Sequence, residues 1–454
     1  MIKNIAKQSD GLWTDILLFA LPVAASNMVQ QLFNSADTAV VGQFAGNLEL
    51  AAMGSTSVVV TLYITVFSGF AVGANVVIAR LVGARAKDDL PRAMYTVLVS
   101  AVVLGVLLTV LGQLTVTPIL QIMSTPENII ASARRYLRIY LLGTVFQMLY
   151  NFESAALRAS GDTKRPLICL ILSGVLNVGL NLFFVIVWDM GVAGVAIATV
   201  LSGAVSALLL LVYLLHGNSE LKLSRQHMKL DGQLAKAIMR IGLPAAIQGI
   251  LFNAANIIIQ TGVNVFGDSV ISGSSIGITA EVFIYHLICG FGQASVTFNG
   301  QYFGAGQLAR CWANTRSCLL LGCLLTEAFA GVLLLCRAPF VGIFTPDVQV
   351  GACAMLRMQC VLMFEVFNLI IEVMSGALRG LGYSVTPAAL SAVFVCGLRI
   401  AWVFVVFPHA QTFQMLMAVY PASWGAAALT ISAAYLIVKR KLAAQAAAAD
   451  CGGG

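Results

Sequence analysis

The sequence predicts an all-α membrane protein whose twelve transmembrane helices form two six-helix repeats. The first observation is composition: 59% of the 454 residues are hydrophobic and only 10% are charged, whereas soluble domains average roughly 45–50% and 25%. Mean hydropathy is +0.91. The second observation is a series of long apolar segments, and the third is an internal duplication. A soluble fold of this length cannot bury so much apolar surface, so we expect the chain to lie in a bilayer.

The apolar segments have the length of membrane-spanning helices. A bilayer core about 30 Å thick needs about 20 helical residues at about 1.5 Å each. Charged residues, glycines and prolines separate twelve such stretches, which cover residues 16–41, 52–79, 93–117, 136–158, 167–187, 191–215, 236–262, 271–303, 315–336, 353–378, 388–407 and 413–438. The Ala- and Gly-rich residues 443–454 are predicted to be a disordered tail.

The two halves of the chain are copies of each other. Ala156-Leu157-Arg158 reappears as Ala377-Leu378-Arg379, and Leu21-Pro22 reappears as Leu243-Pro244, so the interval between the copies changes by a single position. Six spans per copy is an even number, so the repeats are parallel rather than inverted. A membrane protein built from two like halves has a natural site at the seam between them, which favours a transporter. The expected parts are a lobe of residues 1–215, a cytoplasmic linker of 216–235 and a lobe of 236–442.

The placement of Lys and Arg predicts that both termini are cytoplasmic. With this orientation 20 of the 26 basic residues lie on the cytoplasmic side. The exceptions are Arg399, inside the eleventh span, and five residues in outer segments, namely Arg134, Arg135, Arg138, Arg337 and Arg357. The net charge of +7 is therefore a topological signature spread over short loops, and no nucleic-acid partner is expected.

Several functional classes lack their sequence signatures. The chain has no GxxxxGK[ST] phosphate loop and no loop long enough for a nucleotide-binding domain. It also lacks an HExxH motif, and its ten cysteines show no metal-ligand spacing. We therefore expect no enzyme and no cofactor, and transport that is either passive or driven by an ion gradient.

Polar side chains recur on one face of several predicted spans, where lipid cannot satisfy them. Such amides either line a cavity or join helices, the latter at about 0.6–2 kcal/mol per hydrogen bond. The residues that we assign to the lining of a substrate cavity are Gln31, Asn34, Asn151, Gln248 and Asn256.

Asp37 is the carboxylate on the polar face of the first span. The matching place in the second copy reads Ile258-Ile259-Gln260, so the shared fold does not require an acid there. A charged carboxylate at mid-bilayer costs roughly 3 kcal/mol. We interpret Asp37 as a functional residue.

The second copy carries charges of its own. Glu365 and Glu372 align with Thr144 and Asn151, and Arg399 aligns with Val178 or Asn177. We expect Arg399 to face the two carboxylates, because a lone guanidinium in mid-span needs a counter-charge; a purely structural ion pair is the alternative reading. The predicted second-lobe polar network comprises Glu281, Glu365, Asn368, Glu372 and Arg399.

Several motifs in this order resemble those of the multidrug and toxic compound extrusion (MATE) antiporters. No single motif is decisive, but their order and the repeat are, and the resemblance covers nearly the whole chain. The motifs are Leu21-Pro22, QLFNSADT at 31–38, Val41-Gly42, GAR at 83–85, ALRASGDT at 156–163, GLP at 242–244, Gly300-Gln301 and GALRG at 376–380.

The resemblance implies two six-helix lobes that form a V-shaped central cleft, and efflux of amphipathic, often cationic compounds in exchange for H⁺ or Na⁺. Asp37 matches the ion-coupling carboxylate of the first lobe, and Asn177 and Thr199 match polar ligands beside it. Asn181 stands where some members have an Asp, which removes one negative charge. Together these four residues are the predicted ion-coupling site.

The coupling ion follows from the charge of that site. Its neutral oxygens could complete a Na⁺ shell, but a single carboxylate favours H⁺. In the second lobe, Asn253 and Asn368 stand where certain branches of the family carry acids, and Glu365 or Glu372 is the expected substitute.

The predicted function is that of a secondary active antiporter in the cell membrane, exporting amphipathic cations in exchange for H⁺ or Na⁺. Its expected partners are small amphipathic molecules and membrane lipid, and we expect a monomer. A lipid-linked-sugar flippase of the same superfamily is the main alternative, although it should show a more basic cavity for pyrophosphate. A passive channel would not need the unmatched carboxylates, and a membrane-embedded enzyme would need a catalytic constellation.

Overall fold

A computed structural model describes residues 11–216, 221–223 and 229–452, with side chains described as far as residue 448. Within these ranges the chain is almost entirely helical and contains no strand. The predicted all-α fold is confirmed. Contacts group the chain into two compact units, and the division falls inside two helices rather than in the predicted linker.

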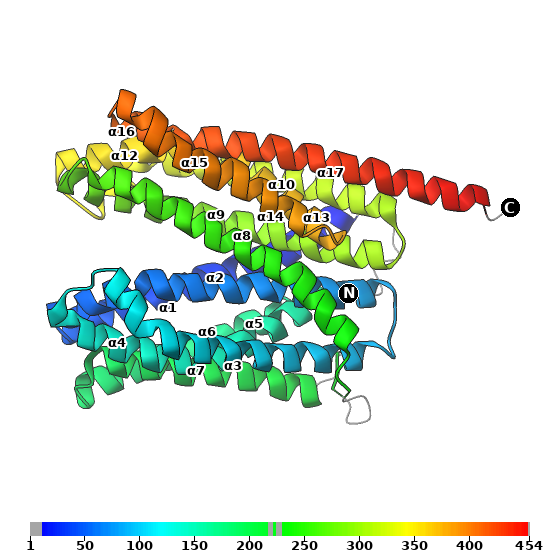
Figure 1. Ribbon diagram of the computed structural model, residues 1–454, viewed down its shortest axis with the longest axis horizontal. Helices are drawn as coiled ribbons and strands as arrows, with labels where there is room; N and C mark the ends of the chain where they lie inside the picture. The colour runs from blue at the N-terminus through cyan, green and yellow to red at the C-terminus, as the bar shows by residue number, and fades with distance from the viewer. Residues whose placement is uncertain (1–10, 217–220, 224–228, 453–454) are drawn as a thin grey trace. The chain divides into compact units, whose positions relative to one another are not determined.

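The first unit, here called the N-unit, spans Ala25–Ala246. In it α5 packs against α2, α3 and α7, and α6 packs against α7. Figure 1 shows these helices as one bundle. Its elements are most of α1 (Leu12–Phe44), α2 (Asn47–Gly83), α3 (Leu90–Ile122), α4 (Glu127–Leu142), α5 (Thr144–Ala159), α6 (Lys164–Leu182) with a π-helical end at Phe183–Val187, α7 (Gly191–His216) and the start of α8 (Gly232–Asn264).

The second unit, the C-unit, combines Met1–Ala24 with Ile247–Gly454. Its centre is α9, which packs against α10, α12 and α13. Its further elements are α9 (Asp268–Gly304), α10 (Leu308–Leu335), α11 (Arg337–Gly342), α12 (Val348–Leu362), α13 (Glu365–Gly380), α14 (Val385–Ser391), α15 (Leu398–Ala401) between the π-helical segments Ala392–Gly397 and Trp402–Val406, α16 (Phe413–Met417) and α17 (Val419–Gly452).

The helices agree with the predicted spans apart from the fourth and tenth. Among the described residues, ten helices are long and apolar enough to cross a membrane, and α12 with α13 makes an eleventh that bends by 45°. The predicted fourth span, 136–158, is divided at Gly143 between α4 and α5. The predicted disordered tail is wrong as far as Gly452, where α17 ends, because alanine is the strongest helix former. Residues 453–454 lie outside the described residues.

Two glycine-mediated crossings repeat the same packing in both units. A Cβ on Gly69 of α2 would lie 2.3 Å from the Cα of Ala246 in α8, and a Cβ on Gly290 of α9 would lie 2.5 Å from the carbonyl oxygen of Ala20 in α1. Gly69-Phe70 and Gly290-Phe291 are corresponding positions of the repeat. Such approaches of two backbones require glycine, so the start of α8 belongs to the N-unit and the start of α1 to the C-unit.

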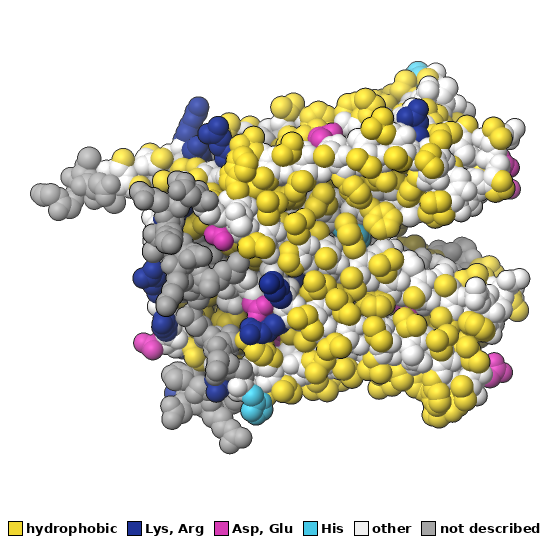
Figure 2. All heavy atoms as spheres, turned by 180° about the vertical axis from the view of Figure 1, so that it is seen from behind, with side chains coloured by type: hydrophobic (Ala, Val, Ile, Leu, Met, Phe, Trp, Pro, Cys, Tyr) yellow, Lys and Arg dark blue, Asp and Glu magenta, His cyan; other side chains and the backbone are white. Residues whose placement is uncertain are grey.

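Apolar side chains cover most of the helical surface on the face that Figure 2 shows, and charged ones are few there. On α6, Ile168, Leu172 and Val175 are all more than half exposed and lie at helical spacing. A surface of this kind is stable only against lipid, and the chain is a multi-pass membrane protein.

Candidate functional site

The N-unit gathers the four predicted ion-coupling residues around one carboxylate. Asp37 of α1 is 6% exposed, and Asn181 of α6 is fully buried. Asn181 donates from Nδ2 to Asp37 Oδ1 at 2.5 Å and to Asn177 Oδ1 at 3.3 Å. The Thr199 hydroxyl of α7 lies 3.4 Å from Asp37 Oδ2 and receives a hydrogen bond from Asn177 Nδ2 at 3.5 Å. We call these four residues the Asp37 cluster.

Local sequence explains why three helices meet there. Gly174 lets α6 approach α1, because a Cβ on this residue would lie 1.7 Å from the ring of Phe33, one turn before Asp37. Asn177 and Asn181 follow Gly174 on α6 and are one turn apart, so they lie on one helix face. On α7, the single hydroxyl proton of Thr199 is shared between Asp37 and a nearer acceptor, the carbonyl oxygen of Val195 at 2.9 Å.

In the described chain, the carboxylate of Asp37 has no positively charged side chain in contact with it. Among the residues that the structure describes, no Lys, Arg or His lies within ion-pair distance of Asp37. The phenols of Tyr136 and Tyr140 lie within electrostatic range and are buried. One acceptor is left over, because Asn181 Oδ1 is buried and has no hydrogen-bond partner in the described part of the chain. A carboxylate beside an unused amide oxygen is a donor set that suits a proton or a small monovalent cation.

The residues predicted to line a cavity have different surroundings. Gln31 and Asn34 are exposed on α1, while Asn151 is half-buried and donates to the carbonyl oxygen of Gln147 in its own helix at 2.8 Å. Asn256 is exposed and accepts a hydrogen bond from Arg399.

Gln248 is not available to a substrate, which corrects its assignment to the lining. It is 3% exposed. Its Nε2 donates to Ser391 Oγ at 2.9 Å, and its Oε1 accepts from Arg379 at 2.6 Å. The side chain therefore joins α8 to α13 and α14. The sequence placed Gln248 on a polar helix face but could not show that two partners already occupy its amide.

The expected pairing of Arg399 with Glu365 and Glu372 is wrong. Arg399 is 1% exposed and donates to Asn256 Oδ1 at 2.6 Å and to Ser423 Oγ at 3.3 Å. Over the described residues, no carboxylate lies within ion-pair distance of it. Glu365 instead accepts from Asn368 of its own helix at 3.0 Å.

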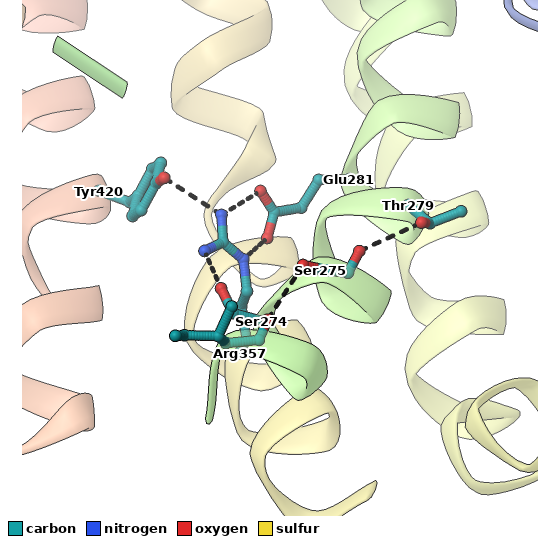
Figure 3. A network of polar contacts seen from close by, with 7 residues as sticks. Ser274, Ser275, Thr279, Glu281, Arg357 and Tyr420 are labelled. Atoms are coloured by element: carbon teal, nitrogen blue, oxygen red, sulfur yellow. Dashed lines mark hydrogen bonds and ion pairs between the residues drawn. The ribbon is translucent and has the colours of Figure 1, made fainter. Parts of the chain in front are cut away.

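The carboxylate that does find a guanidinium is Glu281, and its partner is Arg357. Arg357 donates from Nε and Nη2 to the two oxygens of Glu281 at 2.6 and 2.9 Å, from Nη1 to Ser274 Oγ at 2.8 Å and from Nη2 to the Tyr420 hydroxyl at 3.1 Å. Figure 3 shows these side chains converging from α9, α12 and α17. Gly277 makes room for Arg357, because a Cβ there would lie 2.9 Å from its side chain.

The distribution of basic residues assigns Arg357 to an outer segment. In the structure its side chain is buried, with 2% of the residue's surface exposed. The sequence held a weak signal for its burial, since it lies within the predicted span 353–378. A second buried group, which the sequence did not assign to a functional site, is Glu153 of α5, which is fully buried. Neither of its carboxyl oxygens has a hydrogen-bond partner in the described ranges.

Comparison with known proteins agrees with the duplicated architecture. The MatE family model matches the chain twice, over residues 22–183 and 244–405. "Probable multidrug resistance protein NorM" of Thermotoga maritima is 28% identical over 401 residues, covering 87% of this chain and 86% of that protein. "Probable multidrug resistance protein YoeA" of Bacillus subtilis is 27% identical over 448 residues, covering 96% of each.

Solved structures show the same fold. A structure described as "Outward-facing conformation of a multidrug resistance MATE family transporter of the MOP superfamily" matches with a TM-score of 0.85 at 20% identity, over 96% of this chain and 99% of that one. A "MOP superfamily transporter from Pyrococcus furiosus" matches with a TM-score of 0.87 at 20% identity and the same coverage. Because the MatE model covers most of both repeats, the chain belongs to the MatE family of multidrug and toxic compound extrusion transporters.

Proposed function

We propose that this transporter is a secondary active antiporter, which exports amphipathic cations in exchange for one monovalent cation, H⁺ or Na⁺, bound at Asp37. The observation that carries the proposal is a buried carboxylate held only by neutral groups. Asp37 is 6% exposed and its hydrogen-bond donors are an amide and a hydroxyl. A charge in such surroundings is stable enough to exist and costly enough to favour neutralisation.

Asn181 provides the means of sensing that neutralisation. As oriented, its Nδ2 donates to the ionised carboxylate and its Oδ1 is unused. Half a turn of the amide plane would present Oδ1 instead, which suits a protonated carboxyl group or a bound Na⁺. Binding of the cation thus changes the contact between α1 and α6, and this differential contact can favour one conformation of the N-unit over another.

Exchange follows from competition for one negative charge. A cationic drug and the coupling ion both gain from the potential of Asp37, so each favours release of the other without both being bound. The names of the relatives from Thermotoga maritima and Bacillus subtilis, which describe them as multidrug resistance proteins, support small-molecule drugs as substrates. The flippase alternative is not favoured, because the buried arginines of the described chain, Arg357, Arg379 and Arg399, each donate to a protein acceptor already.

The proposal is tested by ethidium export from reconstituted vesicles under an imposed H⁺ or Na⁺ gradient. We expect wild type to export under at least one gradient and Asp37→Asn, which has nearly the same volume, to export at the level of empty vesicles. The matched control is Asp15→Asn, the same change on the same helix at a half-buried position, which should keep wild-type export. Wild-type export by Asp37→Asn would show that the carboxylate is structural.

The proposed topology places both termini in the cytoplasm of the cell, following the distribution of Lys and Arg. Reporter fusions check it. A fusion after Lys441 should give cytoplasmic reporter activity, and one in the 265–267 loop should give high alkaline phosphatase activity. The reverse pattern would contradict the orientation and leave the Asp37 proposal intact.

A further inference from the structure

The C-unit contains a counterpart of the Asp37 cluster that the repeat identifies. Asn177 and Arg399 are separated by the same interval as the starts of the two family matches, residues 22 and 244. Thr199 and Ser202 correspond to Tyr420 and Ser423, at the interval that separates Ala156 from Ala377. The second-copy residues are also in contact with one another, since Arg399 donates to Ser423 and its guanidinium lies 4.7 Å from the centre of the Tyr420 ring.

The two places have opposite charge. In the N-unit, α1 supplies a carboxylate and α6 supplies an amide that donates to it. In the C-unit, α8 supplies an amide oxygen, Asn256 Oδ1, and α15 supplies the guanidinium of Arg399 that donates to it at 2.6 Å. The position of Asp37 is taken in the second copy by Ile259, which is 1% exposed. The neutral acceptor Asn256 stands at the position of Asn34, one turn before Asp37, and the charged donor Arg399 stands at the position of Asn177.

Arg399 is held as a cation by neutral and aromatic groups. Its side chain contacts Asn256, Ser423 and the faces of Tyr420 and Trp424, the last at 5.8 Å. Aromatic faces stabilise a desolvated guanidinium, and arginine stays protonated in proteins. Glu281 lies within electrostatic range but is engaged by Arg357, so no carboxylate in contact competes for Arg399 over the described residues.

We infer that Arg399 is a tethered cation, whose guanidinium permanently occupies the C-unit counterpart of the ion site at Asp37. This assignment deepens the proposed function and rests on it for the number of ions exchanged. Because an internal cation cannot leave, only the N-unit exchanges an ion and each transport cycle carries a single coupling ion. Arg399 is then a positioning residue for the C-unit rather than a group that touches substrate.

The placement of Arg399 can be tested by stability alone. Ile259→Asp should be tolerated in wild type, because the new carboxylate can pair with the guanidinium, and should lower the melting temperature of the purified protein by about 5–10 °C in an Arg399→Met background, where the charge is uncompensated. Val263→Asp is the matched control. Val263 lies one turn further along α8, is fully buried in the same cluster, and should cost the same in both backgrounds. Equal costs for Ile259→Asp in both backgrounds would overturn the inference.

The role of the charge can be tested by efflux. Arg399→Lys keeps a cation without the guanidinium fork and should retain most ethidium export, whereas Arg399→Met should lose about tenfold, as expected when a charged hydrogen-bond donor is removed. Export by Arg399→Met at the wild-type rate would overturn the role, as would equal losses in both variants. If wild type itself exports nothing, the proposed antiport fails, and the melting temperatures still decide where Arg399 lies.

Discussion

The Asp37 cluster and the group of Arg399, Asn256, Ser423, Tyr420 and Trp424, here called the Arg399 cluster, occupy corresponding places in two copies of one fold. They differ in charge and in the hydrogen bonding of the charged side chain's surroundings. Around Asp37 one buried amide oxygen has no partner in the described chain, and the carboxylate is held by neutral donors. Around Arg399 the cation meets two acceptors and two aromatic faces. Duplication thus preserves the frame of helices, and we propose that one copy keeps an exchangeable ion site while the other fills the corresponding place with its own side chain.

Beside the Arg399 cluster, Arg357 and Glu281 form the fully engaged ion pair of the C-unit. Arg357→Met should lower the free energy of unfolding by about 3–5 kcal/mol, because it leaves Glu281 without its counter-charge. Adding Glu281→Gln should recover part of that loss. Thermal unfolding in detergent measures both. Arg316→Met, on the exposed face of α10, is the control and should stay close to wild type. A mild effect of Arg357→Met, similar to that of the control, would contradict the contrast between the paired guanidinium groups of Arg357 and Arg399 and the partly unpaired Asp37 cluster.

The two glycine-mediated helix crossings, one in each copy, should be equally sensitive to an added methyl group. Gly69→Ala places a Cβ against backbone atoms of α8, and Gly290→Ala places one against backbone atoms of α1. Each should lower the free energy of unfolding by about 1–3 kcal/mol through overpacking. Gly54→Ala, in the same helix as Gly69 with nothing within 4 Å of the new Cβ, should be neutral or slightly stabilising. Melting temperatures of the three variants provide the comparison. A cost confined to one copy would show that the two crossings are not equivalent.

A smaller effect should follow from adding charge to the exchangeable site. Asn181→Asp places a second carboxylate in contact with Asp37, and two such groups cannot both ionise without a cation between them. Export should become more dependent on Na⁺, with an apparent affinity for Na⁺ about tenfold higher, equivalent to about 1.4 kcal/mol. Asn264→Asp makes the same change at an exposed position of α8 in the C-unit, outside the Asp37 cluster, and should leave the Na⁺ dependence unchanged. Unaltered Na⁺ dependence of Asn181→Asp would argue against an ion at Asp37.

Periodicity and duplication were sufficient to predict much of this architecture. The apolar segments and the repeat predicted the helices and their order, because a bilayer imposes the length of each span. The grouping of Asp37 with Asn177, Asn181 and Thr199 came from the family resemblance, and the structure brings these four residues together. Their role in ion coupling remains the proposal above.

The partners of Arg399, Arg357 and Gln248 could not be predicted. Which buried groups meet depends on the rotation of each helix about its axis and on small residues such as Gly277 that let a long side chain pass. Sequence alone therefore placed Arg399 opposite Glu365 and Glu372, when its acceptor is Asn256. The helical end of α17 was also missed, because alanine and glycine were read together as a sign of disorder although only glycine disfavours a helix.

The central claim is that one ion is exchanged per cycle and that it binds at Asp37. It can be measured by adding a cationic substrate to purified protein in weakly buffered detergent solution, and by counting protons with a pH indicator and sodium with a radioactive tracer. The account predicts that wild type releases about one monovalent cation per substrate bound, that Asp37→Asn releases none, and that Glu365→Gln behaves as wild type. Substrate-induced release that persists in Asp37→Asn, or two cations released by wild type, would contradict it.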